Sequence, residues 1–228
     1  MRVAGQYSDK QWIRLKKRLQ QNPSKRLWDL AFRRFFRTRI DTRYLKPMAS
    51  IRAGGTELGE GFAIVAVFCT LVEFLESCER GRNFRFIGRT GAPLQPNEYS
   101  ERQAAGYFKD FLRTRRPFNA LVPAALVDRF YGDVRCGLVH EARTKGGWVI
   151  STKASGGALI SQKGSDITLF RNELIPALEV YITDYRRRLL TDAWTQAAFI
   201  RKFDHLCTLG FLIELEWMGD DVTRQGAV

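Results

Sequence analysis

The chain is poor in the residues that usually build metal sites. Its 228 residues include only two histidines and four cysteines. The cysteines, at positions 69, 78, 136 and 207, form no C-x-x-C pair, and there is no H-E-x-x-H motif or Asp-rich cluster. We therefore expect neither a metal site nor a cofactor.

Two common catalytic motifs are missing as well. The sequence contains no G-x-x-x-x-G-K-[ST] phosphate-binding loop and no G-x-S-x-G nucleophile turn. A G-x-G occurs at Gly59 and Gly61, but no strand is predicted before it, so it does not indicate a dinucleotide site.

A secretory signal and a membrane span are not expected either. Basic residues from Arg14 to Arg18 interrupt any apolar run near the start. The longest strongly apolar stretch, Phe62 to Val72, is too short to cross a bilayer. Unpaired cysteines in apolar surroundings are typical of a reducing compartment, so we expect a cytoplasmic location without stable membrane insertion.

Acidic residues are scarce at the start of the chain. The whole chain has 37 Lys and Arg against 24 Asp and Glu, a formal charge of +13. Residues 1–46 contain 14 basic and only 3 acidic residues, so most of the excess lies there. This asymmetry indicates a polyanionic partner, nucleic acid first and an anionic membrane surface second. A solvated basic helical face is the structural alternative.

Hydrophobic periodicity predicts a mainly α-helical protein. Ser8 and Gln11 form a capping box before a first helix, and Ser24 starts a second, amphipathic and basic one. Residues 59–80 predict a central buried helix, because apolar residues occupy all of its sides. Further helices are expected at about 100–116, 123–141, 168–190 and 192–217.

The periodicity changes after residue 146. Short strand-like runs at 148–152 and 158–161 flank a glycine-containing turn and predict a small inserted β-hairpin at about 147–162. We expect residues 1–50 to form a basic helical extension packed on the core. Residues 51–217 would form the helical domain, and residues 218–228 a C-terminal tail.

The main candidate for chemistry is an Arg-x4-His pattern. Arg135 and His140 lie near the end of a predicted helix, with Gly137 between them. On an ideal helix, positions five apart are about 140° apart, so these side chains converge only if the helix breaks near Gly137 or if Arg135 reaches across. Purely structural roles are the alternative. His140 would then cap a helix end, and Arg135 would pair with Asp133 or Glu141.

This motif, late in a helical bundle, resembles the signature of the HEPN family (higher eukaryotes and prokaryotes nucleotide-binding). The resemblance covers roughly residues 59–190. Many members are metal-independent endoribonucleases of toxin–antitoxin, anti-phage and RNA-processing systems. The resemblance implies a HEPN-like helical bundle and a homodimer with a composite active site. It also implies catalytic Arg135 and His140, RNA as substrate, and an antitoxin or defence-system partner. Cys136 departs from the family, which often has Asn, Asp or His at this position.

The residue types suit RNA cleavage by the RNA's own 2′-hydroxyl. Histidine exchanges protons near neutral pH. Arginine stabilises the charge that grows on the phosphate. One histidine per chain supplies one proton carrier, and a dimer would supply two. Products with a 2′,3′-cyclic phosphate are therefore expected without added metal.

Further residues are assigned supporting roles. Glu73 is an acid in the apolar helix and needs a partner. An arginine of the motif helix would supply it, either ordering the site or only joining two helices. Arg143 and Lys145 follow the motif and would contact phosphates. The basic helix would contact RNA through Arg26, Arg33, Arg34 and Arg37.

Further expectations concern the role of His205 and two alternative functions of the whole chain. His205 precedes Gly210 near a predicted helix end, where histidine usually interacts with free carbonyls, so a structural role is expected for it. The whole chain would alternatively be a non-catalytic helical module that binds nucleic acid or protein. As a third hypothesis, the basic amphipathic helices near residues 8–42 would attach the protein to a membrane surface.

Overall fold

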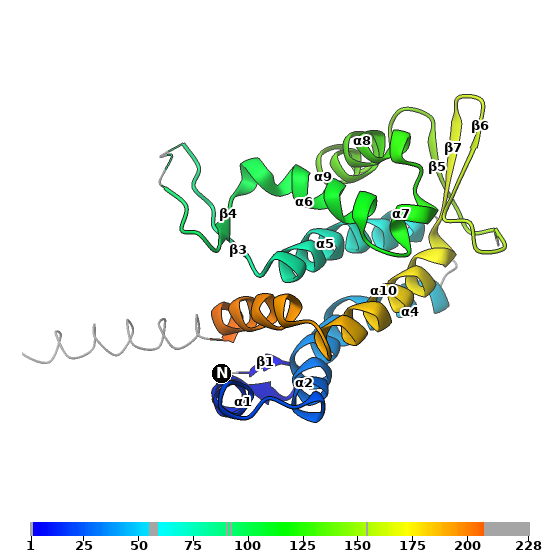
Figure 1. Ribbon diagram of the computed structural model, residues 1–228. Coiled ribbons are helices and arrows are strands. Elements are labelled where there is room, and N and C mark those ends of the chain that lie inside the picture. The colour runs from blue at the N-terminus through cyan, green and yellow to red at the C-terminus, as the bar shows by residue number, and fades with distance from the viewer. Residues whose placement is uncertain (1, 55–58, 90, 92, 154, 208–228) are drawn as a thin grey trace, which may run out of the picture.

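Helices dominate the structure, as the periodicity predicts (Figure 1). The computed structural model describes residues 2–54, 59–89, 91, 93–153 and 155–207. The helices form three layers in the view of Figure 1. The N-terminal helices lie on one side, α5 and α10 lie in the middle, and the helices around the Arg-x4-His motif lie on the other side.

The N-terminal layer begins at the predicted caps. The Gln11 side chain accepts a hydrogen bond from the Ser8 backbone, and the Ser24 hydroxyl accepts one from the Leu27 backbone N–H. Two π-helical segments continue the second helix through the basic stretch. The elements are β1 (Arg2–Ala4), β2 (Tyr7–Ser8), α1 (Asp9–Gln21), α2 (Lys25–Ala31), η1 (Phe32–Arg37), α3 (Thr38–Ile40), η2 (Asp41–Leu45) and α4 (Lys46–Ala53).

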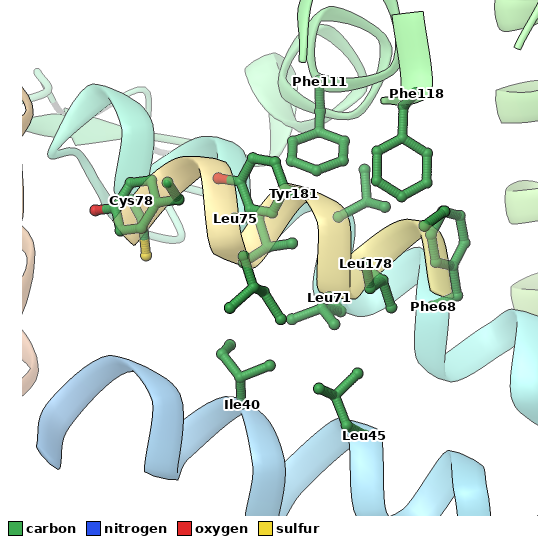
Figure 2. Packing of buried hydrophobic residues seen from close by; sticks show 14 of the residues in the cluster. Ile40, Leu45, Phe68, Leu71, Leu75, Cys78, Phe111, Phe118, Leu178 and Tyr181 are labelled. Carbon is green, nitrogen blue, oxygen red and sulfur yellow. The ribbon is translucent and has the colours of Figure 1, made fainter. Parts of the chain in front are cut away.

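The central layer contains α5 (Glu60–Arg80), α10 (Leu174–Leu189) and a helix whose described part spans residues 193–207. Figure 2 shows apolar side chains of α5 and α10 between Ile40 and Leu45 of the N-terminal layer and Phe111 and Phe118 of the third layer. Trp12, Phe35 and Phe36 of the N-terminal layer belong to the same buried cluster as α5 and α10. Residues 2–50 and the rest of the described chain therefore share one core.

Helix α5 is long and apolar enough to cross a membrane by length and composition alone. The sequence-based expectation that its apolar run is too short was therefore too strict. However, 56% of its most apolar window is buried inside the fold. Burial by neighbouring helices explains the apolar composition of α5, as in the core helix of a soluble protein.

The third layer holds the motif. Helix α6 (Glu101–Thr114) ends close to the predicted position, and its Phe111 packs on Phe118 with ring centroids 5.2 Å apart. The chain then winds through a series of short helical segments with different hydrogen-bond spacing. These are α7 (Phe118–Leu121), η3 (Ala124–Leu126), α8 (Val127–Arg129), π-helical η4 (Phe130–Arg135) and α9 (Cys136–Glu141).

The predicted β-hairpin at 147–162 is wrong in its pairing. Strands β5 (Trp148–Ser151) and β6 (Ile160–Lys163) do not pair with each other. Both pair with β7 (Asp166–Phe170), β5 in parallel and β6 antiparallel. The true hairpin joins β6 to β7 through Gly164, whose φ of +60° suits a two-residue turn. Consequently α10 begins at Leu174 and not near residue 168.

A short parallel pair of strands lies between α5 and α6 along the chain. Strand β3 (Asn83–Phe84) pairs with β4 (Glu98–Tyr99). This pair brings Tyr99 next to α5, where its hydroxyl reaches Glu73. The helix predicted at about 192–217 is described from residue 193 to residue 207, and its remainder and the tail at 218–228 lie outside the described residues.

Candidate functional site

Arg135 lies at the wall of a cavity of about 460 Å³. The cavity forms where α5, the β3–β4 pair, α9 and the 193–207 helix meet. It is lined by Cys69, Thr70, Glu73, Phe74, Ser77, Phe84, Tyr99, Arg135, Val139, Lys202, His205 and Leu206. We call it the Arg135 cavity.

Two neighbours hold the Arg135 side chain in place. One guanidinium nitrogen lies 3.9 Å from Glu73 Oε2, and the guanidinium stands 5.5 Å from the centre of the Tyr131 ring. The Tyr99 hydroxyl donates a hydrogen bond of 3.3 Å to Glu73 Oε1. The expected pairing of Glu73 with an arginine of the motif helix is thus present. Arg135 does not take the alternative partners Asp133 and Glu141.

The two tyrosines beside this ion pair are hydrogen-bond donors at neutral pH. Burial raises the pKa of Tyr99, and the negative charge of Glu73 raises it further. Burial likewise raises the pKa of Tyr131, whereas Arg135 acts in the opposite direction. Both hydroxyls therefore remain protonated, and that of Tyr99 keeps its hydrogen bond to Glu73.

The local helix geometry explains why Arg135 faces inward. It is the last residue of η4, whose π-helical turns carry more residues than an α-helical turn. Such turns are frequent at functional sites, because they rotate the following side chains relative to a regular helix. The rotation brings Arg135 toward α5.

His140 does not join Arg135 in the cavity. It lies on the exposed surface of α9, and within the described residues it forms no hydrogen bond. The hypothesis that the helix breaks near Gly137 is wrong, because α9 continues to Glu141. The two side chains of the motif therefore diverge within one chain, as the roughly 140° angle of a regular helix predicts.

His205 does line the Arg135 cavity, although the sequence favoured a structural role. Burial lowers its pKa below the ordinary value of 6.5, and the positive charge of Lys202 lowers it further. Lys202 is itself only 4% exposed and donates a hydrogen bond of 3.0 Å to the Arg82 carbonyl. The position of His205 depends on how the 193–207 helix packs on the β3–β4 pair, for which no local sequence signal exists.

The other residues near the motif lie outside the cavity lining. Cys136 is partly buried on α9. Arg143 and Lys145 both pair with Glu141, at 3.0 and 2.5 Å. These two cations lower the pKa of the Glu141 carboxyl, Lys145 more than Arg143. They are therefore already engaged by a surface carboxylate.

Three of the four basic residues assigned to RNA contact meet in one place. Arg26, Arg33 and Arg34, together with Arg18, line a surface hollow of about 580 Å³ where α1 meets α2 and η1. Arg37 lies apart, because its guanidinium donates two hydrogen bonds to Glu179, of 2.6 and 2.9 Å. We call the hollow lined by Arg18, Arg26, Arg33 and Arg34 the N-terminal basic hollow.

Within the described ranges no group of three or more His, Cys, Asp or Glu side chains is arranged to hold a metal ion. Comparison with protein-family models, with curated proteins and with solved structures finds no match to this chain.

Proposed function

We propose that this protein is a metal-independent endoribonuclease of the HEPN type that acts as a homodimer. The observation that carries the proposal is Arg135 at the wall of its cavity, 3.9 Å from Glu73, with His140 exposed five residues further along the chain. The negative charge of Glu73 favours this position of the guanidinium before a substrate arrives. Because His140 is exposed and turned away from Arg135 of its own chain, it is accessible to a second protomer.

The proposed reaction uses the RNA's own nucleophile. Arg135 binds a non-bridging oxygen of the scissile phosphate and stabilises its growing negative charge. His140 of one protomer accepts the proton of the 2′-hydroxyl while its oxygen bonds to phosphorus. His140 of the second protomer donates a proton to the departing 5′-oxygen. The products are a 2′,3′-cyclic phosphate and a 5′-hydroxyl.

Exposed apolar side chains beside the site support the dimer. Val139, between the motif residues, is 55% exposed, and Phe84 is 46% exposed. Both line the Arg135 cavity. Burying such a patch is favourable, and a second copy placed there would bring its own Arg135 and His140 to the same cleft.

The N-terminal basic hollow would bind the phosphates of the RNA away from the scissile bond. Its arginines contribute affinity and not sequence preference. A cytoplasmic location belongs to this proposal, as does a role as a toxin or anti-phage effector restrained by an antitoxin or defence-system partner.

The test is cleavage of a labelled RNA in EDTA, compared with the same RNA carrying a single 2′-deoxynucleotide before the main cleavage site. The proposal predicts cleavage of the first and protection of the second at that bond, with cyclic phosphate ends. Cleavage of the deoxy-substituted bond, or an absolute need for a divalent ion, would rule out the mechanism.

A second function, a non-catalytic nucleic-acid-binding module, is favoured by one observation. Within the described residues, His140 has no hydrogen-bond partner that would orient it for proton transfer. Under this alternative, His140→Ala leaves RNA binding unchanged and the wild type does not cleave. Salt-dependent binding through the N-terminal basic hollow would then be the whole activity.

A further inference from the structure

A second cavity, of about 530 Å³, gathers five arginines that the sequence did not single out. It shares no lining residue with the Arg135 cavity. The arginines come from the ends of α5, α6 and α10, from the turn after α5, and from the 193–207 helix. They are Arg80, Arg82, Arg115, Arg188 and Arg201.

Buried carboxylates fix three of these arginines. Glu76 is fully buried and lies 2.8 Å from Arg80 Nε and 2.9 Å from Arg115 Nε. Glu79, 6% exposed, lies 2.5 Å from Arg188. Buried ion pairs of this kind hold the cavity wall rigid, because breaking one leaves an uncompensated charge.

The remaining two arginines have no such partner. Neither Arg82 nor Arg201 forms an ion pair with a carboxylate of the described residues, and Arg201 donates a hydrogen bond of 3.3 Å to the Arg80 carbonyl. Asp192, which also lines the cavity, instead accepts two hydrogen bonds from Thr195, of 2.7 and 2.6 Å. Five arginines face only two carboxylates, Glu79 and Asp192, in the cavity lining, so the net charge offered to a ligand is positive.

An exposed aromatic ring completes the cavity. Trp194 is 70% exposed, and the Arg201 guanidinium lies 5.8 Å from its ring centre. The indole ring is therefore accessible to a ligand in the cavity. An indole face beside an arginine suits the stacking of a nucleobase whose phosphate is bound nearby.

We propose that this cavity binds a nucleotide, with Arg82 and Arg201 on the phosphate and Trp194 against the base. Its volume lies within the range of about 300–1,000 Å³ that is usual for small-ligand sites. The nucleotide is either free or the 5′-phosphorylated end of an RNA strand. The site does not depend on the ribonuclease proposal, because binding here requires no cleavage.

The test is calorimetric titration of the wild-type protein with AMP, inorganic phosphate and adenosine. A fourth probe is a 2′-O-methylated trinucleotide, which resists cleavage, with and without a 5′-phosphate. Because a charged hydrogen bond is lost, Arg82→Ala and Arg201→Ala are each expected to weaken AMP binding by about tenfold or more. Trp194→Ala should weaken AMP binding but leave phosphate binding unchanged.

The matched control is Arg187→Ala, which removes an arginine from α10 that is 72% exposed and outside this cavity. It should change AMP affinity less than twofold. Arg201→Lys keeps the charge and can be measured if Arg201→Ala misfolds. Its affinity for AMP should lie between those of wild type and Arg201→Ala. Stronger binding of AMP than of the 5′-phosphorylated trinucleotide identifies a free nucleotide, and the reverse identifies an RNA end.

Absence of binding by all probes would overturn the proposal. So would an AMP affinity that the Arg82→Ala, Arg201→Ala double variant leaves unchanged.

Discussion

The position of Arg135 depends on single side chains around it. Glu73 supplies the opposite charge, Tyr99 orients that carboxylate, and the Tyr131 ring lies beside the guanidinium. A catalytic arginine must be held close to its productive position, because small displacements reduce rates strongly. If Glu73 positions Arg135, its substitution should slow cleavage. If Glu73 only joins two helices, its substitution should affect stability and not cleavage.

Glu73→Gln is expected to keep the fold but reduce RNA cleavage by roughly 10- to 100-fold, because the guanidinium loses its charged partner. The reduction should fall on kcat more than on KM. Glu141→Gln is the control, since this exposed carboxylate binds Arg143 and Lys145 outside the cavity. Equal activity of Glu73→Gln and wild type would assign Glu73 a structural role.

His205 should make the fold sensitive to acid. Burial and Lys202 lower its pKa in the folded protein below 6.5. When the pH falls below about 6.5, the unfolded chain therefore takes up a proton that the folded chain does not, and stability decreases until the pH passes the folded pKa. Well above pH 6.5, His205 is neutral in both the folded and the unfolded chain, so it no longer changes the free energy of unfolding with pH.

The measurement is the urea midpoint at pH 7.5 and at pH 5. His205→Gln should lose less stability than wild type between these two values. A pH dependence that is the same in both proteins would show that His205 is not responsible.

At the scale of elements, α9 is fixed by close packing at Gly137. A Cβ atom at this position would lie 2.5 Å from the Arg143 carbonyl oxygen, a backbone atom that cannot turn away. Gly106 lies on the exposed side of α6, where an added Cβ atom would meet no neighbouring atom within 4 Å. The two helical glycines are therefore a matched comparison.

Gly137→Ala should destabilise the protein by about 1–3 kcal/mol, because the chain after α9 must shift. Gly106→Ala should be neutral or stabilise by roughly 0.5–1 kcal/mol, since alanine is the better helix former. Chemical denaturation measures both. A destabilisation of Gly106→Ala as large as that of Gly137→Ala would contradict this packing.

Local signals explain which elements were predictable. The helices that begin at Ser8 and Ser24, and the buried helix α5, follow from caps and periodicity that act within a few residues. The pairing of β5 with β7 could not be predicted, because a parallel partner that is distant along the chain leaves no local pattern. The site divides in the same way. Arg135 and Glu73 were predictable from the motif and a buried charge, whereas His205 reaches the cavity only through tertiary packing.

At the scale of the whole molecule, the proposed function requires two copies of the chain. The apolar patch of Val139 and Phe84 lies at the Arg135 cavity, so dimerisation there would complete the site. Val180 on α10 is 54% exposed, close to the 55% of Val139, and lies outside the Arg135 cavity. These two valines form a matched pair for a test of the interface.

Val139→Glu is expected to shift the protein toward monomer and to reduce cleavage in parallel, because a charge would have to be buried in the interface. Val180→Glu should retain both dimer and activity. Sedimentation velocity measures the first property and RNA cleavage the second. A wild type that is monomeric while it cleaves RNA would contradict the composite site.

The most direct measurement is cleavage of a labelled mixed RNA in EDTA by wild type, Arg135→Ala, His140→Ala and His205→Gln. The proposed site predicts that wild type cleaves, that Arg135→Ala and His140→Ala fold but lose activity by about 10²-fold or more, and that His205→Gln stays active. Full activity of His140→Ala, or loss of activity in His205→Gln alone, would contradict the assignment of His140 as the proton carrier.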